Sequence, residues 1–219
     1  MLEPGLADGV KLYVGVLAVQ GAVEEHLAAL RRAGARLGLD VEAVEVRTPN
    51  GLAGVHGLVI PGGESTTISR LLRSSGLQSK IVLRARRGDL ALFGTCAGLI
   101  LLSSRAVHGV EDKDIELLGL LDCEVDRNAF GRQKDSFEAR VQVTGMGAVP
   151  AVFIRAPVLT SAWAPTETLA KTGEGIVAVR KGLILGTAFH PELTGDTRLH
   201  EEFLRLCSEA ARSAGKRQS

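Results

Sequence analysis

The feature that most constrains the fold of this chain is an alternation, in its first half, of short apolar runs with amphipathic stretches of helical spacing. Three of the runs, residues 14–19, 57–60 and 90–93, each lead into a turn rich in glycine. A continuous apolar run of this length is typical of a strand buried on both faces, as in a parallel sheet. The alternation therefore predicts a parallel sheet with helices on both sides.

The stretches between the runs place their apolar residues on one face. The expected elements are a helix that buries Val23, Leu27 and Leu30 and ends at Ala33-Gly34, a strand over residues 41–46, a helix after Ser65 that buries Ile68, Leu71 and Leu72, and an apolar helix over residues 99–102.

The second half of the chain has mainly strand-like patterns. We expect strands over residues 122–127, 136–143 and 151–155, a hairpin of residues 176–179 and 183–189 around Lys181-Gly182, and a final helix with Leu199, Phe203, Leu206 and Ala210 on one face. The fold class is α/β: one three-layer domain over residues 1–219, with a mixed, mostly parallel sheet that becomes partly antiparallel towards the C-terminus. Residues 1–10 and 213–219 are expected to be flexible ends.

Composition narrows the class of partner. The formal net charge of the 219 residues is +1, which gives no support for nucleic acid or an anionic membrane as a partner. Three cysteines without metal-ligand spacing argue against a disulfide framework and fit a reducing compartment. Neither a secretory signal nor an apolar stretch of about 20 residues is visible. We therefore expect a cytoplasmic location.

Cys96 lies between an apolar strand and a helix, in the segment Gly94-Thr-Cys-Ala-Gly98. This is the arrangement of a nucleophile elbow with cysteine in place of serine. A position at a helix N-terminus favours the reactive thiolate, and the backbone N–H of Ala97 would point towards an oxyanion. Taken alone, the motif leaves about even odds between a nucleophile and a buried core cysteine.

His190 and Glu192 follow the expected hairpin, in Phe-His-Pro-Glu-Leu. A thiol needs a base, and the base needs an acceptor that orients it. His190 can be the base and Glu192 the acceptor, although a histidine in a loop is more often structural. The other histidines are interpreted as structural or solvated. His26 and His200 lie in amphipathic helical stretches, and His56 and His108 lie in turns without a carboxylate at comparable spacing.

The segment Pro61-Gly-Gly-Glu-Ser-Thr-Thr67 joins a buried strand to a helix. Free backbone N–H groups at such a junction suit an anion or an oxyanion. The alternative is an ordinary helix start with Ser65 as the N-cap, and the segment taken alone favours this alternative.

Together these segments resemble the class I, or triad, glutamine amidotransferases. Seven blocks in family order resemble the glutaminase subunit of pyridoxal 5′-phosphate synthase (the PdxT/SNO family): residues 15–21, 60–67, 94–100, 127–133, 135–138, 152–157 and 189–194. The resemblance implies a flavodoxin-like amidotransferase fold. The segments before Leu12, from 105 to 117 and from 161 to 175 match nothing specific.

The resemblance also implies roles for individual residues. Cys96 would attack the glutamine carboxamide, His190 would move the protons, and Glu192 would orient His190. The implied glutamine-binding positions are Gly63, Glu64, Ser65, Arg127, Ile154 and Arg155, with the N–H groups of Gly63 and Ala97 as the oxyanion hole. No metal or organic cofactor is needed, because a thiolate with backbone donors suffices for acyl transfer.

The implied partner is the barrel-shaped synthase subunit, which would receive the ammonia for pyridoxal 5′-phosphate (vitamin B6) synthesis. Two alternatives remain open: a glutaminase that serves another synthase, such as that of imidazole glycerol phosphate, and a non-catalytic interaction subunit that kept the fold. The blocks at 127–133 and 152–157 weigh against the first. The intact Cys96, His190 and Glu192 weigh against the second.

Overall fold

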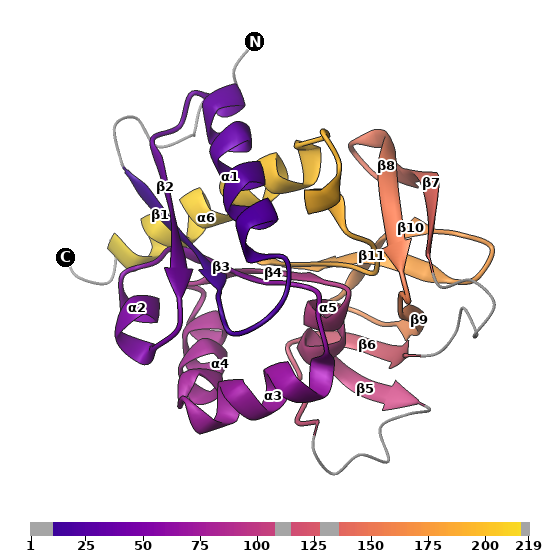
Figure 1. Cartoon of the computed structure of the whole chain (residues 1–219), viewed down its shortest axis with the longest axis horizontal. Helices are drawn as coiled ribbons and strands as arrows, with labels where there is room; N and C mark the ends of the chain where they lie inside the picture. Colours follow the sequence, from indigo (N-terminus) through magenta and orange to yellow (C-terminus); the bar gives the residue numbers. More distant parts are fainter. Residues whose placement is uncertain (1–10, 108–114, 128–135, 216–219) are drawn as a thin grey trace.

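The computed structural model describes residues 11–107, 115–127 and 136–215, which form a large mixed sheet between two layers of helices (Figure 1). The helices are α1 (Val23–Leu37), α2 (Pro49–Ala53), α3 (Ser65–Ser74), α4 (Leu77–Arg87), α5 (Ala97–Leu102), the short 3-10 helix η1 (Pro191–Leu193) and α6 (Arg198–Gly215). The strands are β1 (Leu12–Leu17), β2 (Val41–Val46), β3 (Gly57–Ile60), β4 (Ala91–Thr95), β5 (Ser103–Val107), β6 (Leu121–Asp126), β7 (Ser136–Val143), β8 (Gly147–Ile154), β9 (Val158–Ala162), β10 (Glu167–Lys171), β11 (Ile176–Lys181) and β12 (Ile184–Thr187).

The centre of the sheet is parallel. Its strands run in the order β2-β1-β3-β4-β12, and each neighbouring pair is parallel. With β12 in the place of a fifth strand, this is the flavodoxin-like order. Beyond β12 the sheet continues through β11, β9, β6 and β5, where antiparallel pairs appear. The expected mixed, mostly parallel sheet is therefore confirmed.

Helices cover both faces of this sheet, as the alternating pattern predicts. In Figure 1, α1 and α6 lie on one face, and α3, α4 and α5 lie on the other. The final helix buries the four residues expected on its inner face, Leu199, Phe203, Leu206 and Ala210. None of the helices within the described residues combines the length and the apolar character that crossing a bilayer needs.

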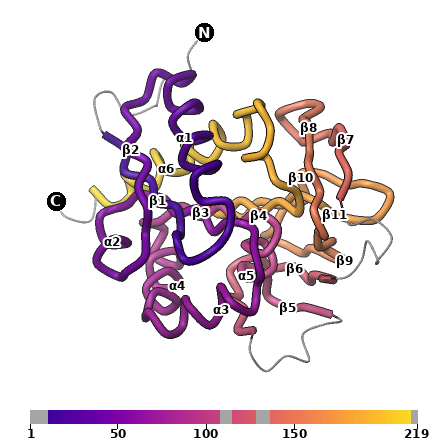
Figure 2. The backbone as a smooth tube through the Cα atoms, viewed as in Figure 1, coloured from indigo at the N-terminus to yellow at the C-terminus, as the bar shows by residue number. Residues whose placement is uncertain are grey.

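A separate hairpin of β7 and β8 stands at one end of the sheet, beside β10 and η1 (Figure 2). The strands expected over 136–143 and 151–155 are its two arms, although β8 begins earlier, at Gly147. The expected hairpin around Lys181-Gly182, of β11 and β12, is confirmed, since the two strands pair antiparallel. Because β12 also pairs parallel with β4, it carries the chain to the edge where β4 ends.

The expected end of the first helix at Ala33-Gly34 is wrong. Helix α1 continues to Leu37 and ends at Gly38, which has a left-handed conformation with φ of 67°. Gly34 lies inside the helix because a Cβ there would come 2.7 Å from a methyl group of Val41 on β2. Gly34 therefore allows α1 to pack closely on β2 and does not end the helix.

The expected burial of Leu71 is also wrong. In α3, Ile68 and Leu72 are buried, but Leu71 is 37% exposed. Helices α2 and α4 and strands β5, β9 and β10 were not expected. Helix α4 buries only Leu77 and Ile81 among many basic residues, so its apolar periodicity is weak.

The final helix includes residues 213–215, which we expected in a flexible end. The other expected flexible residues, 1–10 and 216–219, lie outside the described residues, as do His108 and residues 128–135.

Candidate active site

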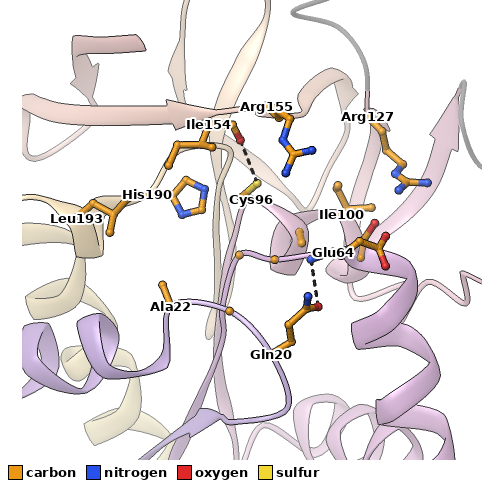
Figure 3. A pocket seen from close by; sticks show the side chains of 15 residues that line it. Gln20, Ala22, Glu64, Cys96, Ile100, Arg127, Ile154, Arg155, His190 and Leu193 are labelled. Atoms are coloured by element: carbon orange, nitrogen blue, oxygen red, sulfur yellow. Dashed lines mark hydrogen bonds between the residues drawn. The ribbon is translucent and has the colours of Figure 1, made fainter. Parts of the chain in front are cut away.

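A pocket of about 600 Å³ opens where the central parallel strands end (Figure 3). Its walls come from the segments that follow the parallel strands β1, β3, β4 and β12, which places it at the carboxyl edge of these strands. Residues at the ends of β6 and β8 complete the walls. Open α/β sheets bind ligands at this edge. Every residue expected in the site, except Glu192, lines the pocket: Gly63, Glu64, Ser65, Cys96, Ala97, Arg127, Ile154, Arg155 and His190.

Cys96 occupies a strained turn between β4 and α5. Its φ of 50° and ψ of −105° are rare for a residue with a side chain, and such strain persists where the surrounding structure enforces it. The backbone N–H of Cys96 donates to the carbonyl oxygen of Thr187 at 2.8 Å. Behind the turn, a Cβ on Gly98 would overlap the carbonyl of Ile60. The glycine therefore lets α5 pack directly on β3.

His190 lies beside Cys96 because β4 and β12 are neighbours. Thr95 and Thr187 pair in register at the ends of these strands, so the chain segments that follow them leave the sheet together. The backbone N–H of His190 donates to Val152 of β8 at 2.8 Å. Nδ1 of His190 is 2.7 Å from Oε1 of Glu192, and Glu192 is only 3% exposed.

The charge state of His190 follows from these contacts. Burial by itself lowers the pKa of His190, but the hydrogen bonds and charges of Cys96 and Glu192 outweigh burial and raise the pKa to about 10. The imidazole is therefore stabilised in its charged form between a sulfur and a carboxylate. That arrangement supports a thiolate–imidazolium pair of the kind that activates a cysteine nucleophile.

The other cysteines lie in different surroundings. Cys123 and Cys207 are fully buried in the core, and burial raises the pKa of both thiols. Cys96 instead is 8% exposed and faces the pocket, where its Sγ lies 3.9 Å from the carbonyl oxygen of Ile154 (Figure 3). Of the three thiols, only that of Cys96 combines access to the pocket with a base.

The turn after β3 approaches this pair closely. A Cβ on Gly62 would overlap the imidazole of His190 and lie 3.3 Å from Cβ of Cys96, so only glycine fits there. The N–H of Gly62 donates to Oγ1 of Thr95 at 3.1 Å. Ala97 is the first residue of α5, and the first N–H groups of a helix have no partner within it. Gly63 and Ala97 both line the pocket together with Cys96.

The interpretation of Ser65 as the N-cap of α3 is wrong. Glu64 is the cap: its carboxylate accepts the N–H groups of Thr66 at 2.9 Å and Thr67 at 2.7 Å. Burial raises the pKa of Glu64, but the hydrogen bonds from Thr67 and Thr66 outweigh it and lower the pKa to about 2. Glu64 therefore brings a permanent negative charge to the rim of the pocket.

Arginines lie across the pocket from Glu64 (Figure 3). Arg155 directly follows β8 and has a φ of 41°. Within the described part of the chain, Cys96 and Arg155 are the residues other than glycine with positive φ, and both line this pocket. Strained backbone gathers at ligand sites. Arg127 directly follows β6, so one guanidinium group comes from the main sheet and the other from the β7–β8 hairpin.

Among the residues in or behind the site that were not expected, Gln20, Thr95 and His26 form hydrogen bonds through their side chains. Gln20 lines the pocket, and its Oε1 accepts the N–H of Glu64 at 3.2 Å (Figure 3). Thr95 and His26 lie behind the pocket, where Nε2 of His26 is 3.2 Å from Oγ1 of Thr95. The turn at Gln20-Gly21 was a visible signal for the first. Nothing in the helical pattern around His26 distinguishes it from an ordinary core histidine.

Fold and site together define a class: an α/β protein with a cysteine at a strand-to-helix elbow and a buried histidine–carboxylate pair beside it. A family model for the SNO glutamine amidotransferase family matches residues 16–209. The chain therefore belongs to the SNO glutamine amidotransferase family.

Close relatives carry one name. A protein of Archaeoglobus fulgidus named pyridoxal 5′-phosphate synthase subunit PdxT is 50% identical over 193 residues, which cover 88% of this chain and 97% of that protein. Proteins of the same name from Thermus thermophilus and Streptomyces avermitilis are 49% and 52% identical, over 88% of this chain and 96% and 92% of their own lengths.

Solved structures agree on the fold. A crystal structure described as a glutamine amidotransferase superposes with a TM-score of 0.78 at 47% identity, over 89% of this chain and 98% of that chain. A putative GMP synthase subunit from Thermoplasma acidophilum has a TM-score of 0.58 at 16% identity, over 96% and 99% of the two chains. This second likeness shows the shared fold alone. The expected amidotransferase fold class is thus confirmed.

Proposed function

We propose that this chain is the glutaminase subunit of a pyridoxal 5′-phosphate synthase, which hydrolyses L-glutamine and passes the ammonia to a barrel-shaped synthase subunit. The observation that carries the chemistry is the contact of Cys96 with His190, whose Nδ1 is held 2.7 Å from Glu192. The name shared by relatives about half identical in sequence supports the destination of the ammonia. The unpaired cysteines support a cytoplasmic location.

The reaction follows from the position of each group. With Nδ1 held by Glu192, the other ring nitrogen of His190 takes the thiol proton of Cys96. The thiolate attacks the carboxamide carbon of glutamine, and the N–H groups of Gly63 and Ala97 stabilise the oxyanion. His190 then protonates the leaving ammonia, which leaves a thioester on Cys96. Water, deprotonated by His190, hydrolyses the thioester to glutamate and the free thiol.

The pocket suits a free amino acid because it offers both charges. The Glu64 carboxylate can pair with the α-ammonium group, and Arg155 or Arg127 can pair with the α-carboxylate. Ser65 and the backbone of Ile154 complete the proposed contacts. Two apolar side chains at the rim, Ile154 at 38% exposure and Leu193 at 43%, support a partner that covers the mouth of the pocket.

An ammonia-release assay of wild type and Cys96→Ala, each with and without the synthase subunit, tests the proposal. We expect glutamine hydrolysis by wild type with the synthase, much less by wild type alone, and none by Cys96→Ala. Inactivity of wild type with the synthase would overturn the glutaminase assignment. Equal turnover with and without the synthase would overturn the dependence on docking. A pull-down that recovered a different synthase would overturn the proposal that the ammonia is used for pyridoxal 5′-phosphate synthesis.

A further inference from the structure

A buried polar cluster lies behind the candidate active site, outside the chemistry described so far. His26 of α1 and His200 of α6 are completely buried, and the two helices pack against each other on one face of the sheet. Nδ1 of His26 is 3.1 Å from Nε2 of His200. Nε2 of His26 is 3.2 Å from Oγ1 of Thr95 and 3.4 Å from Oε2 of Glu192.

From this geometry we infer that His26 is a positioning residue: its Nε2–H, shared between Glu192 and Thr95, holds the carboxylate that orients His190 and steadies the turn beside the nucleophile. The expected effect on glutaminase kinetics rests on the proposed function. The expected effect on the titration of His190 does not. Thr95 is included because its hydroxyl oxygen accepts the N–H of Gly62, where an added Cβ would overlap the imidazole of His190.

The hydrogen-bond pattern assigns the protons. Within the described residues, Nδ1 of His200 has no hydrogen-bond partner, whereas its Nε2 faces His26. A neutral imidazole has one N–H, and a buried N–H without a partner is costly, so His200 carries its proton on Nε2 and donates to Nδ1 of His26. Nδ1 of His26 is then the acceptor, and its proton lies on Nε2, which faces Glu192 and Thr95.

Glu192 needs this donor. Its Oε1 has His190, but its Oε2 is buried and has no conventional hydrogen bond within the described residues; the His26 N–H at 3.4 Å is a long contact. A carboxylate oxygen left unpaired in the interior is strongly destabilising. Closing this contact by a few tenths of an ångström would satisfy the oxygen and restrict rotation of the carboxylate.

Both histidines are suited to a neutral, directional role. Burial lowers the pKa of His26 well below its ordinary value, and the neighbouring His200 and His190 lower it further. Burial, with a smaller contribution from the charge of Arg32, lowers the pKa of His200 to about 3. At neutral pH the pair therefore donates hydrogen bonds without adding a positive charge that would compete with His190 for Glu192.

Two substitutions of His26 distinguish the loss of the Nε2 hydrogen-bond donor from the loss of the imidazole ring. Gln at position 26 places an amide near the position of Nε2, so His26→Gln keeps a donor for Glu192 and Thr95. Asn reaches only the position of Nδ1, so His26→Asn loses that donor. The control is His56→Asn, since Nδ1 of His56 likewise accepts one hydrogen bond, here from the backbone N–H of Tyr13 at 3.1 Å, but His56 does not line the pocket.

The experiment has two measurements: glutaminase kinetics in the complex with the synthase, and the titration of His190 by NMR on the full isolated chain. We expect His26→Asn to lower kcat by about tenfold or more with KM changed less than about threefold, because misorientation of a catalytic group acts on the chemical step. The titration midpoint of His190 falls in this variant. His26→Gln stays near wild type in both measurements, as does His56→Asn.

Wild-type kcat and an unchanged His190 titration in His26→Asn would overturn the inference. Equal losses in the Asn and Gln variants, accompanied by equal losses of thermal stability, would also overturn it, because they would indicate a packing role only. If wild type itself releases no ammonia with the synthase, the proposed function fails. The His190 titration, which needs no glutamine, then still decides whether His26 positions Glu192.

Discussion

Nδ1 of His190 lies 2.7 Å from Oε1 of Glu192, although the two residues are separated by a single proline. The 3-10 turn of η1 brings the two side chains to the same side, so both partners of this pair come from one short segment. The segment is anchored at one end by the hydrogen bond from His190 to Val152. The candidate base and its orienting carboxylate are therefore held together by one short segment.

We predict that Glu192→Gln lowers kcat by about a thousandfold, because an orienting carboxylate replaced by its amide stabilises the wrong tautomer of the base. The pKa of His190, raised to about 10 in part by Glu192, falls in the variant. Steady-state glutaminase kinetics and an NMR titration of His190 measure the two effects. The surface variant Glu45→Gln is the control, and a Glu192→Gln enzyme as active as this control would contradict the prediction.

Gly62→Ala is expected to lower kcat/KM by about a hundredfold, since the added methyl group must displace the imidazole of His190. Gly54→Ala is the matched control, because its Cβ would meet nothing within 4 Å. Glutaminase assays of both variants, with thermal unfolding to verify the fold, measure the difference. Full activity of Gly62→Ala would contradict the prediction, because it would show that catalysis tolerates displacement of the His190 imidazole.

Leu72 and Leu71 are neighbours in α3 with opposite surroundings, one buried at 1% exposure and the other exposed at 37%. We expect Leu72→Ala to reduce the free energy of unfolding by about 3 kcal/mol through loss of burial and the cavity left behind. Leu71→Ala is expected to change it by less than about 1 kcal/mol. Urea denaturation of the two variants provides the test, and equal losses would contradict the assigned helix orientation.

Acid sensitivity follows from the buried histidines. Burial lowers the pKa of His200 to about 3, while the unfolded chain takes up the proton near its ordinary value of about 6.5. Between these values the unfolded state binds more protons, so stability falls as the pH falls from about 6.5 towards 3. His200→Gln, which cannot titrate, should lose less thermal stability between pH 8 and pH 5 than wild type. An equal loss in both proteins would contradict the prediction.

Much of the fold could be predicted from local patterns. Strands β2, β3 and β7 have the expected bounds, because alternating or continuous apolar runs record burial on one or two faces directly. The end of α1 and the orientation of Leu71 could not be predicted this way. Gly34 is determined by the neighbouring Val41, and the exposure of Leu71 depends on how α3 lies against α5, so both depend on contacts between elements.

The candidate site divides in the same way. The chemical types of the site residues could be predicted from the sequence: a cysteine at a glycine-flanked elbow, a histidine with a carboxylate two residues on, and a glycine turn before a helix. That these groups lie side by side depends on the tertiary structure, because β12 comes from a distant part of the chain and pairs with β4. Gln20, Thr95 and His26 enter the site for the same reason. A side chain without a local motif acquires a role only when other elements bring it a partner.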